Sequence, residues 1–324
     1  MSTDPPSGLL HAYLLDGNGG ATKLDWAKVR AWRPDDGVLW MNLDYSSPDS
    51  ERWLADSDIP QLVRDGLLDV DPRPRALAHG DHLQLIVRGI NLNLGAAPED
   101  MVSVRAWIGP RRVITMRRRM VRTTKTIAAD LERGTGPRDA GEFVTLLLER
   151  LLEQVVLRVD TLGDEIAACE DQVVTGKRGE IRTLLADHRR RAIALRRFLA
   201  PQREALAKLS TVGMPWLDAS HRARIVETAD RMTRTIEELD AARDRAAVTQ
   251  EELQSRLAEQ TNQRLYVLSL ITVIFVPFAF VTSLLGVNLG VPFNGESWAF
   301  WALCGVFGVV VTIEVWVLRK RGWL

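Results

Sequence analysis

Cysteine is almost absent from this chain. Its 324 residues include only Cys169 and Cys304, which lie far apart, and neither has a second Cys or a His at the spacing of a metal site. This argues against a disulfide framework and against a zinc finger. The Gly-x-Ser-x-Gly, phosphate-loop and His-Glu-x-x-His motifs are also missing. We therefore expect no enzyme, no cofactor and no ATP-driven step.

Net charge is also lacking. Lys plus Arg number 42 and Asp plus Glu number 42, so no basic field favours nucleic acid as a partner. Charge is missing locally as well: residues 265–295 carry none, and residues 297–318 carry only Glu314. The mean hydropathy of −0.07 thus averages an aqueous part and a part suited to lipid. The opening MSTDPPSGLL has neither the basic start nor the apolar core of a signal peptide.

The two charge-poor stretches are long enough to cross a membrane. Residues 265–287 and 298–318 are 23 and 21 residues long, and about 20 helical residues span the hydrocarbon core. A buried helix of a soluble protein is usually shorter or interrupted by polar residues. We predict two transmembrane helices joined by a loop over 288–297.

Basic residues predict the orientation of these two helices. Arg264 precedes the first, a basic tail over 319–324 follows the second, and the loop holds no Lys or Arg. By the positive-inside rule, both termini are cytoplasmic and the loop is external. Glu314, near the cytoplasmic end, either reaches the headgroups or has a functional role.

A narrow stripe of small or weakly polar residues runs along the first predicted span. Its members recur every three or four residues: Leu265, Leu268 (or Ser269), Thr272, Val276, Ala279, Ser283 and Gly286. Two helices per chain are too few to line a pore, so several copies would have to surround an axis. The stripe either faces such a water-filled axis, or its hydroxyls bond backbone and neighbouring helices.

The remaining chain reads as a cytoplasmic α/β domain over 1–134 and a helical region over 135–264. Runs rich in branched residues predict strands at 9–16, 38–44, 82–92, 101–109 and 111–118. Ser47 and Pro48 predict a helix start. Two long helices follow, and a third runs from Asp218 to Val276 without Gly or Pro, as a stalk that enters the first span.

Charged clusters on these helices have two interpretations. The arginines at 189–191, 196 and 197 form a solvated face, or they contact lipid headgroups or an acidic neighbouring subunit. The acids Asp164, Glu165, Glu170 and Asp171 are solvated, or they bind regulatory metal. The spacing of Asp187, His188 and His221 does not support a metal site.

Taken together, these features resemble the CorA-type divalent metal transporters. The family's typical loop motif is Gly-Met-Asn, whereas this chain has Gly286-Val287-Asn288. Gly-Val-Asn, the stretch NQRLYVLSLITVIFVPFAFVTSLLGVNLG and the final Trp323-Leu324 resemble the ZntB zinc-transporter branch. The stretch GVPFNG departs from that branch's usual Gly-Gly-Ile-Pro-Gly. The resemblance is specific over residues 262–324. Over the rest of the chain it is limited to the order of the predicted domains and helices.

The resemblance implies a funnel-shaped homopentamer in the bacterial inner membrane, with the first span lining the pore. Five Asn288 amides would ring the external mouth and take a cation through its hydration shell. Gly286 and Val287 belong to the same entrance, and Glu296 is placed to attract cations. Asn288 as a simple helix cap is the structural alternative.

Three functions remain in competition. The first is transport of Zn²⁺, with Ni²⁺, Cd²⁺ or Co²⁺ as further ions, and proton coupling as the resemblance implies. The second is a Mg²⁺/Co²⁺ channel, against which Val287 counts weakly. The third is a membrane-tethered sensor without a pore.

Overall fold

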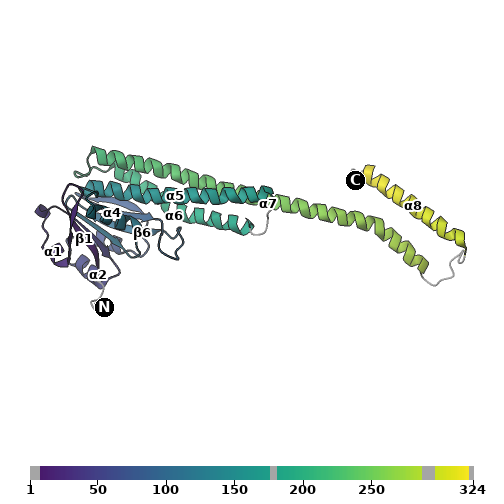
Figure 1. Cartoon of the computed structure of the whole chain (residues 1–324), viewed down its shortest axis with the longest axis horizontal. Coiled ribbons are helices and arrows are strands. Elements are labelled where there is room, and N and C mark those ends of the chain that lie inside the picture. The colour runs from purple at the N-terminus through teal and green to yellow at the C-terminus, as the bar shows by residue number, and fades with distance from the viewer. Residues whose placement is uncertain (1–7, 176–180, 287–295, 321–324) are drawn as a thin grey trace. The chain divides into compact units, whose positions relative to one another are not determined.

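The computed structural model describes residues 8–175, 181–286 and 296–320. The chain divides into two compact units, Met1–Gln250 and Glu251–Leu324. Helix α7 (Ala219–Gly286) contributes to both of them (Figure 1). The predicted α/β domain and the first part of the predicted helical region thus pack together in the first unit.

The first unit is built on a seven-stranded mixed sheet. The strand order is β2-β1-β3-β7-β6-β5-β4, and every neighbouring pair is antiparallel except β3 and β7. The strands are β1 (Leu9–Leu15), β2 (Ala21–Leu24), β3 (Val38–Asp44), β4 (Arg75–His79), β5 (His82–Gly89), β6 (Val102–Ile108) and β7 (Arg112–Arg117). Five of these strands match predicted runs, so those predictions are confirmed.

Strand β3 lies near the centre of the sheet and is buried on both faces. Leu39, Met41 and Leu43 point to one face, where they pack with residues of three short helices. These helices are α1 (Trp26–Ala31), α2 (Pro48–Ala55) and α3 (Gln61–Leu68), with a 3-10 turn at Pro34–Asp36. Trp40 points to the other face and meets Phe143 of α5 at a ring distance of 4.9 Å. Burial on both sides explains the continuous apolar run of this strand.

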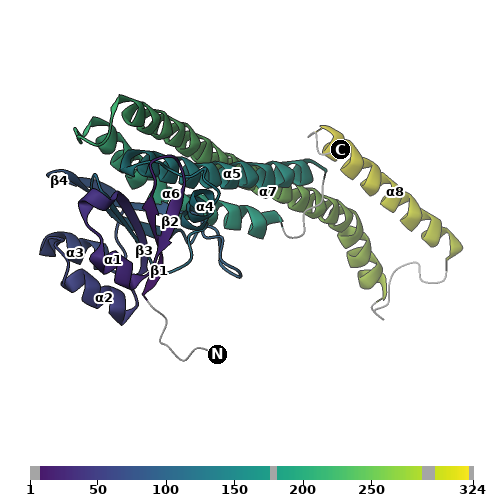
Figure 2. The ribbon, with the colours of Figure 1, turned by 60° about the vertical axis from the view of Figure 1, so that its left-hand side comes forward.

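The second face of the sheet is covered by α4 (Arg122–Glu132), α5 (Ala140–Thr175) and α6 (Ile181–Thr211) (Figure 2). Gln202 of α6 bonds both backbone groups of Arg88, accepting at 2.6 Å and donating at 3.2 Å. Arg88 lies beyond the last residue of β5 that pairs with β4. The amide therefore takes the place of a missing strand and satisfies backbone groups that burial would otherwise leave unpaired.

Helices α5, α6 and the first part of α7 form a bundle. Buried residues of α7 recur at intervals of three or four: Ile225, Ala229, Met232, Ile236, Leu239, Ala242 and Ala246. This spacing gives a continuous apolar seam. Polar bonds flank it, because Arg224 donates twice to Glu149 of α5 and Arg196 of α6 pairs with Asp240 at 2.6 Å. The first part of the expected stalk helix thus gains its stability from tertiary packing.

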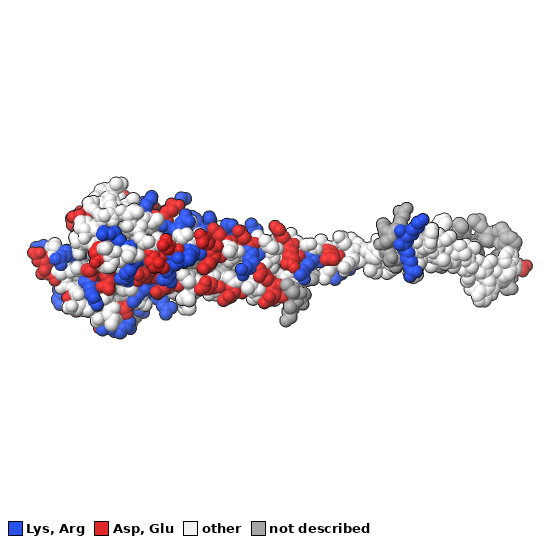
Figure 3. Space-filling model, turned by 90° about the horizontal axis from the view of Figure 1, so that it is seen from above, with Lys and Arg blue, Asp and Glu red and all other residues white. Residues whose placement is uncertain are grey.

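The second unit holds the rest of α7 and helix α8 (Ser297–Lys320). Charged side chains cover the first unit, whereas the apolar helices of the second carry few (Figure 3). Helix α7 has 68 residues and continues past Pro277, an axial path of about 100 Å. The prediction of an unbroken helix from Asp218 to Val276 is confirmed from Ala219, where α7 begins, to Val276.

Candidate functional site

The predicted stripe lies on one continuous helical segment, the last part of α7. Positions three and four apart share a face of an α-helix, so the stripe residues from Leu265 to Ser283 lie along the same side of α7. Leu265, Leu268 and Val276 expose 54, 60 and 57% of their surface within a single chain. An apolar surface of this size calls for lipid or further helices as its cover.

The hydroxyl of Thr272 has a backbone partner. Its Oγ1 donates to the carbonyl oxygen of Leu268 at 2.8 Å, one turn earlier in α7. One of the two interpretations of the stripe was that its hydroxyls bond the backbone, and Thr272 makes such a bond. The hydroxyl oxygen keeps its lone pairs, which can still accept a hydrogen bond from water. At a water-filled axis, Thr272 could therefore accept hydrogen bonds from water while its own hydroxyl proton stays bonded to Leu268.

The connection between α7 and α8, which the sequence predicts to be an external loop, is only partly described. Gly286 is the last residue of α7, and Glu296 is an exposed residue directly before α8. Val287 and Asn288 lie outside the described residues. The predicted Asn288 ring and its helix-cap alternative are therefore both untested by the structure.

Helix α8 has the properties of a membrane span. Among the described residues it is the one helix long and apolar enough to cross a membrane, over Phe300–Val317, with a mean hydropathy of 2.0. A core helix would be buried, yet Phe300 and Trp301 expose 62 and 73% of their surface. At its end the Lys320 ammonium lies 5.1 Å from the Trp316 ring centroid, a pair suited to the membrane interface. The span over 265–287 remains a prediction.

The described residues contain no cluster of three or more His, Cys, Asp or Glu able to hold a metal ion. Two of the four acids considered for regulatory metal, Glu165 and Glu170, have other partners. Glu165 pairs with Arg158 at 3.3 Å and with His188 at 3.2 Å, and Glu170 accepts from Thr249 at 3.1 Å. Asp164 is exposed. These contacts favour a structural role for Glu165 and Glu170.

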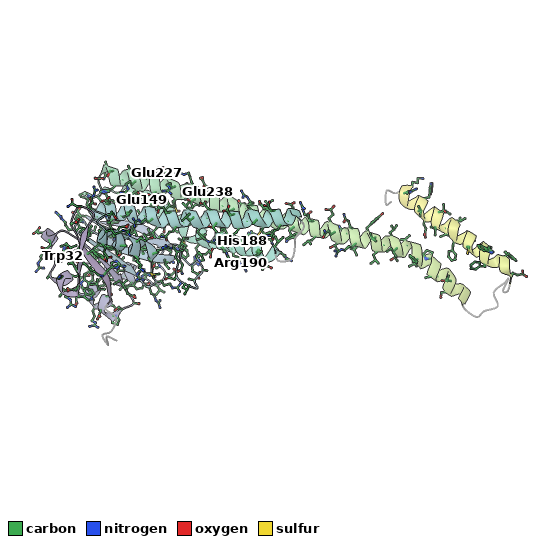
Figure 4. The ribbon with its side chains drawn as sticks, viewed as in Figure 1. Trp32, Glu149, His188, Arg190, Glu227 and Glu238 are labelled. Carbon is green, nitrogen blue, oxygen red and sulfur yellow. The ribbon has the colours of Figure 1, made fainter. Side chains whose placement is uncertain are left out.

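Four of the five clustered arginines of α6, Arg190, Arg191, Arg196 and Arg197, pair with acids of their own chain. Arg190 and Arg191 pair with Asp187 at 3.3 and 2.6 Å, and Arg197 lies 3.6 Å from Asp71. Figure 4 shows Arg190 on α6, close to His188. Exposed pairs of this kind contribute little to stability. They support the solvated-face interpretation rather than a bare basic surface for headgroups.

Histidines 188 and 221 lie in different settings. His188 of α6 contacts Glu165 of α5, whereas His221 lies at the start of α7, 3.1 Å from Asp218 and 3.7 Å from Asp139. Asp139 and Asp218 also accept backbone bonds at the starts of α5 and α7, at 2.8 Å each. The two histidines therefore do not share a site, as their spacing predicted.

One internal site was missed by the sequence argument. Arg158 of α5 donates to Glu99 of the β5–β6 connection from Nε and Nη2, at 3.0 and 2.7 Å, and both side chains are nearly buried. Arg158 is a charged residue on an otherwise apolar helix face, and this pattern could have pointed to the pair. The spacing of residues does not predict that its partner is the distant Glu99.

Comparison with known proteins identifies the family. The profile of the CorA-like Mg²⁺ transporter protein family matches residues 35–320. This chain belongs to the CorA-like family. The prediction that it is not an enzyme agrees with membership of this transporter family.

Individual CorA-like relatives match along the whole chain. The zinc transport protein ZntB of Yersinia enterocolitica is 34% identical, with 98% of this chain and 97% of the relative covered. The divalent cation transporter CmaX of Pseudomonas aeruginosa is 36% identical, with the same coverage. The solved structure of full-length CmaX has a TM-score of 0.89 at 35% identity, covering 99% of this chain and all of that one. The CorA-like fold, with its α/β domain and long helix, is therefore confirmed.

Proposed function

We propose that this chain transports divalent metal cations across a membrane, with Zn²⁺ as the principal ion and Ni²⁺, Cd²⁺ and Co²⁺ as further ones. The observation that carries the proposal is the likeness to ZntB and CmaX over 98% of the chain. A likeness of this extent includes both the sheet unit and the apolar helices. The Gly-Val-Asn loop of the zinc branch supports zinc in particular.

The proposed pathway is an axis between five copies of α7. In this arrangement the stripe from Leu265 to Ser283 faces the ion, and α8 faces lipid. Asn288 amides surround the external mouth and Glu296 raises the local cation concentration before entry. A neutral amide ring binds the hydrated ion through its waters, so the cost of dehydrating a small divalent cation is avoided.

We include proton coupling in the proposal, and the resemblance to the ZntB branch is its only support. Residues 265–287 contain no His, Asp or Glu to carry a proton. The proposed location is the bacterial inner membrane, crossed by residues 265–287 and 298–318 with both termini in the cytoplasm. The domain boundaries given above belong to the same proposal.

The test is ion flux into liposomes that hold the purified protein. Zn²⁺ and Mg²⁺ are supplied separately, each with and without a pH gradient. We expect Zn²⁺ uptake that increases when protons flow in the same direction. Mg²⁺ flux that does not depend on the pH gradient would instead support the second candidate, a Mg²⁺ channel, which the name of the CorA-like Mg²⁺ transporter family favours. An absence of flux for both ions would support the sensor.

The mouth residue is tested by Asn288→Ala. We expect Zn²⁺ flux to fall about tenfold, equivalent to about 1.4 kcal/mol of lost ion stabilisation. Asn294→Ala is the matched control, because it removes the same side chain from the same loop, and we expect flux within twofold of the unchanged protein. Equal flux in all three proteins would remove Asn288 from the pathway.

The oligomer is tested by the mass of the purified protein in detergent, after subtraction of the bound detergent. Five copies of the 36.3 kDa chain give about 180 kDa. A monomer or dimer under conditions that support flux would contradict the proposed five-fold axis.

A further inference from the structure

A concavity of the first unit has no part in the proposed ion pathway. It is a pocket of about 1000 Å³ formed by α1, the 3-10 turn, α2 and the connection between β6 and β7. None of its lining residues belongs to α7 or α8. Its volume lies at the upper end of the range found for small-molecule sites.

Three indole rings contribute to the wall of this pocket. They belong to Trp26, Trp32 and Trp53, and all three are half-buried. The centroids of the Trp26 and Trp53 rings lie 6.3 Å apart, with an interplanar angle of 42°. Trp32 is held in place by its Nε1, which donates to the carbonyl oxygen of Gly37 at 3.3 Å. Ordered indoles at a concave surface offer flat apolar faces to a ring.

The same wall carries an excess of positive charge. Five arginines and three aspartates line the pocket, which leaves two positive charges in excess. Two of the arginines are paired, Arg52 with Asp49 at 3.1 Å and Arg112 with Asp58 at 2.5 Å. Within the described part of the chain, the remaining three, Arg30, Arg33 and Arg111, form no ion pair with a carboxylate.

The unpaired arginines come from separate segments. Arg30 lies on α1 with its guanidinium 5.8 Å from the Trp26 ring centroid, Arg33 precedes the 3-10 turn, and Arg111 lies in the β6–β7 connection. Guanidinium groups bind phosphate and carboxylate oxygens through paired N–H donors. His82 adds a neutral imidazole, because burial and then the charge of Arg112 lower its pKa. The excess of positive charge disfavours a metal cation in this pocket.

We propose that this pocket binds a small anion that carries a flat aromatic ring, of the nucleoside phosphate class. The indoles contact the ring, and the unpaired arginines Arg33 and Arg111 contact the phosphates. The chain has no phosphate-loop motif, so the proposal is binding without hydrolysis. It is independent of which ion the protein transports.

The test is isothermal titration of the purified full-length protein in detergent, with EDTA present so that no metal bridges phosphate and protein. The probes are ADP, adenosine and inorganic phosphate. We expect saturable ADP binding, with adenosine and inorganic phosphate each at least tenfold weaker, because each supplies only one half of the contacts. Failure of ADP to bind would overturn the proposal.

Arg33→Ala combined with Arg111→Ala is the decisive variant. We expect the ADP dissociation constant to rise at least tenfold and that of adenosine to change less than threefold. The control is Arg189→Ala combined with Arg190→Ala on the exposed face of α6, and an unchanged melting temperature shows that each variant is folded. Equal ADP affinity in the two double variants would overturn the proposal. A change of oligomer size in the pocket variant, without loss of ADP binding, would assign this wall to a contact between copies.

Discussion

The buried pair between Arg158 and Glu99 is a single contact that holds two distant segments together. Arg158 belongs to α5, and Glu99 lies in the connection between β5 and β6. The side chains expose only 11 and 7% of their surface. A buried charge that loses its partner keeps its desolvation cost without compensation, so this pair is more sensitive than the exposed pairs of α6.

We predict that Arg158→Met lowers the free energy of unfolding by about 3 to 5 kcal/mol. The measurement is urea unfolding of the full-length protein in detergent, followed by tryptophan fluorescence. Arg190→Met, at an exposed pair, is the control and should stay within about 0.5 kcal/mol. Replacing both partners, by Arg158→Met with Glu99→Met, should cost less than Arg158→Met alone. A cost as small as that of Arg190→Met would show that the Arg158 pair is not buried in solution.

His11 gives the first unit a dependence on pH. Its ring packs on Trp40 with centroids 4.7 Å apart, and burial, followed by the charges of Arg117 and Lys23, lowers its pKa to about 4. The unfolded chain, with an ordinary His pKa of about 6.5, therefore binds more protons between these two values. The free energy of unfolding should fall as the pH is lowered from about 6.5 to about 4.

The His11 prediction is tested by urea unfolding at pH 7 and pH 5, with His11→Gln as the comparison. The contribution of His11 is at most about 3 kcal/mol across the whole window. The unchanged protein should lose more stability between pH 7 and pH 5 than the His11→Gln variant does. The same loss in both proteins would mean that other groups account for the pH dependence.

Among the elements, α7 is the one that joins the sheet unit to the apolar segment. Its first part is fixed by the bundle seam, and its exposed part near Ala258 relies on helix hydrogen bonds. Proline at such a position removes a hydrogen bond and clashes with the preceding turn, at a cost of about 3 kcal/mol. The continuity of α7 is therefore open to a direct test.

We predict that Ala258→Pro lowers Zn²⁺ flux in liposomes at least tenfold, because the bundle no longer sets the position of the apolar segment. Ala258→Ser is the matched control, since it changes the helix propensity by less than about 1 kcal/mol, and it should retain flux. Wild-type flux in the proline variant would show that the helix need not be continuous there.

The helices and strands differ in how well the sequence predicted them. Apolar runs predicted β1, β3, β5, β6 and β7, because burial on at least one face requires such runs. Strands β2 and β4 were missed, since they are short edge strands with exposed residues in ATKL and RALAH. The short helix α1 was also missed, because it is six residues long and buries only Val29, too little for a helical apolar pattern. The parallel pairing of β3 with β7 was also beyond the sequence argument, because it joins residues about 70 positions apart.

At the scale of the whole molecule, the functional regions were predictable to different degrees. The apolar spans and the Gly-Val-Asn motif are contiguous in sequence, so composition and resemblance were enough to propose them. The pocket of tryptophans and arginines draws on four separate segments of the chain. Only the folded sheet unit brings these segments together, and for that reason spacing gave no sign of them.

The proposed orientation in the membrane is testable with a single new thiol. In a background of Cys169→Ala and Cys304→Ala, we expect Glu296→Cys to react with a membrane-impermeant maleimide in intact spheroplasts. Asp58→Cys, in the first unit, should react only after lysis. Reaction of Asp58→Cys in intact spheroplasts, with Glu296→Cys protected, would reverse the orientation.

The pairing of β3 with β7 also has a consequence for biosynthesis. Strand β3 ends at Asp44 and its parallel neighbour ends at Arg117. At translation rates of 5 to 20 residues per second, roughly 4 to 15 s pass between the synthesis of the two. Throughout that time one edge of β3 is unpaired, and an unpaired apolar edge readily takes the wrong partner. The nascent chain thus has a defined interval in which a ribosome-bound chaperone would be most valuable, well before the apolar helices are made.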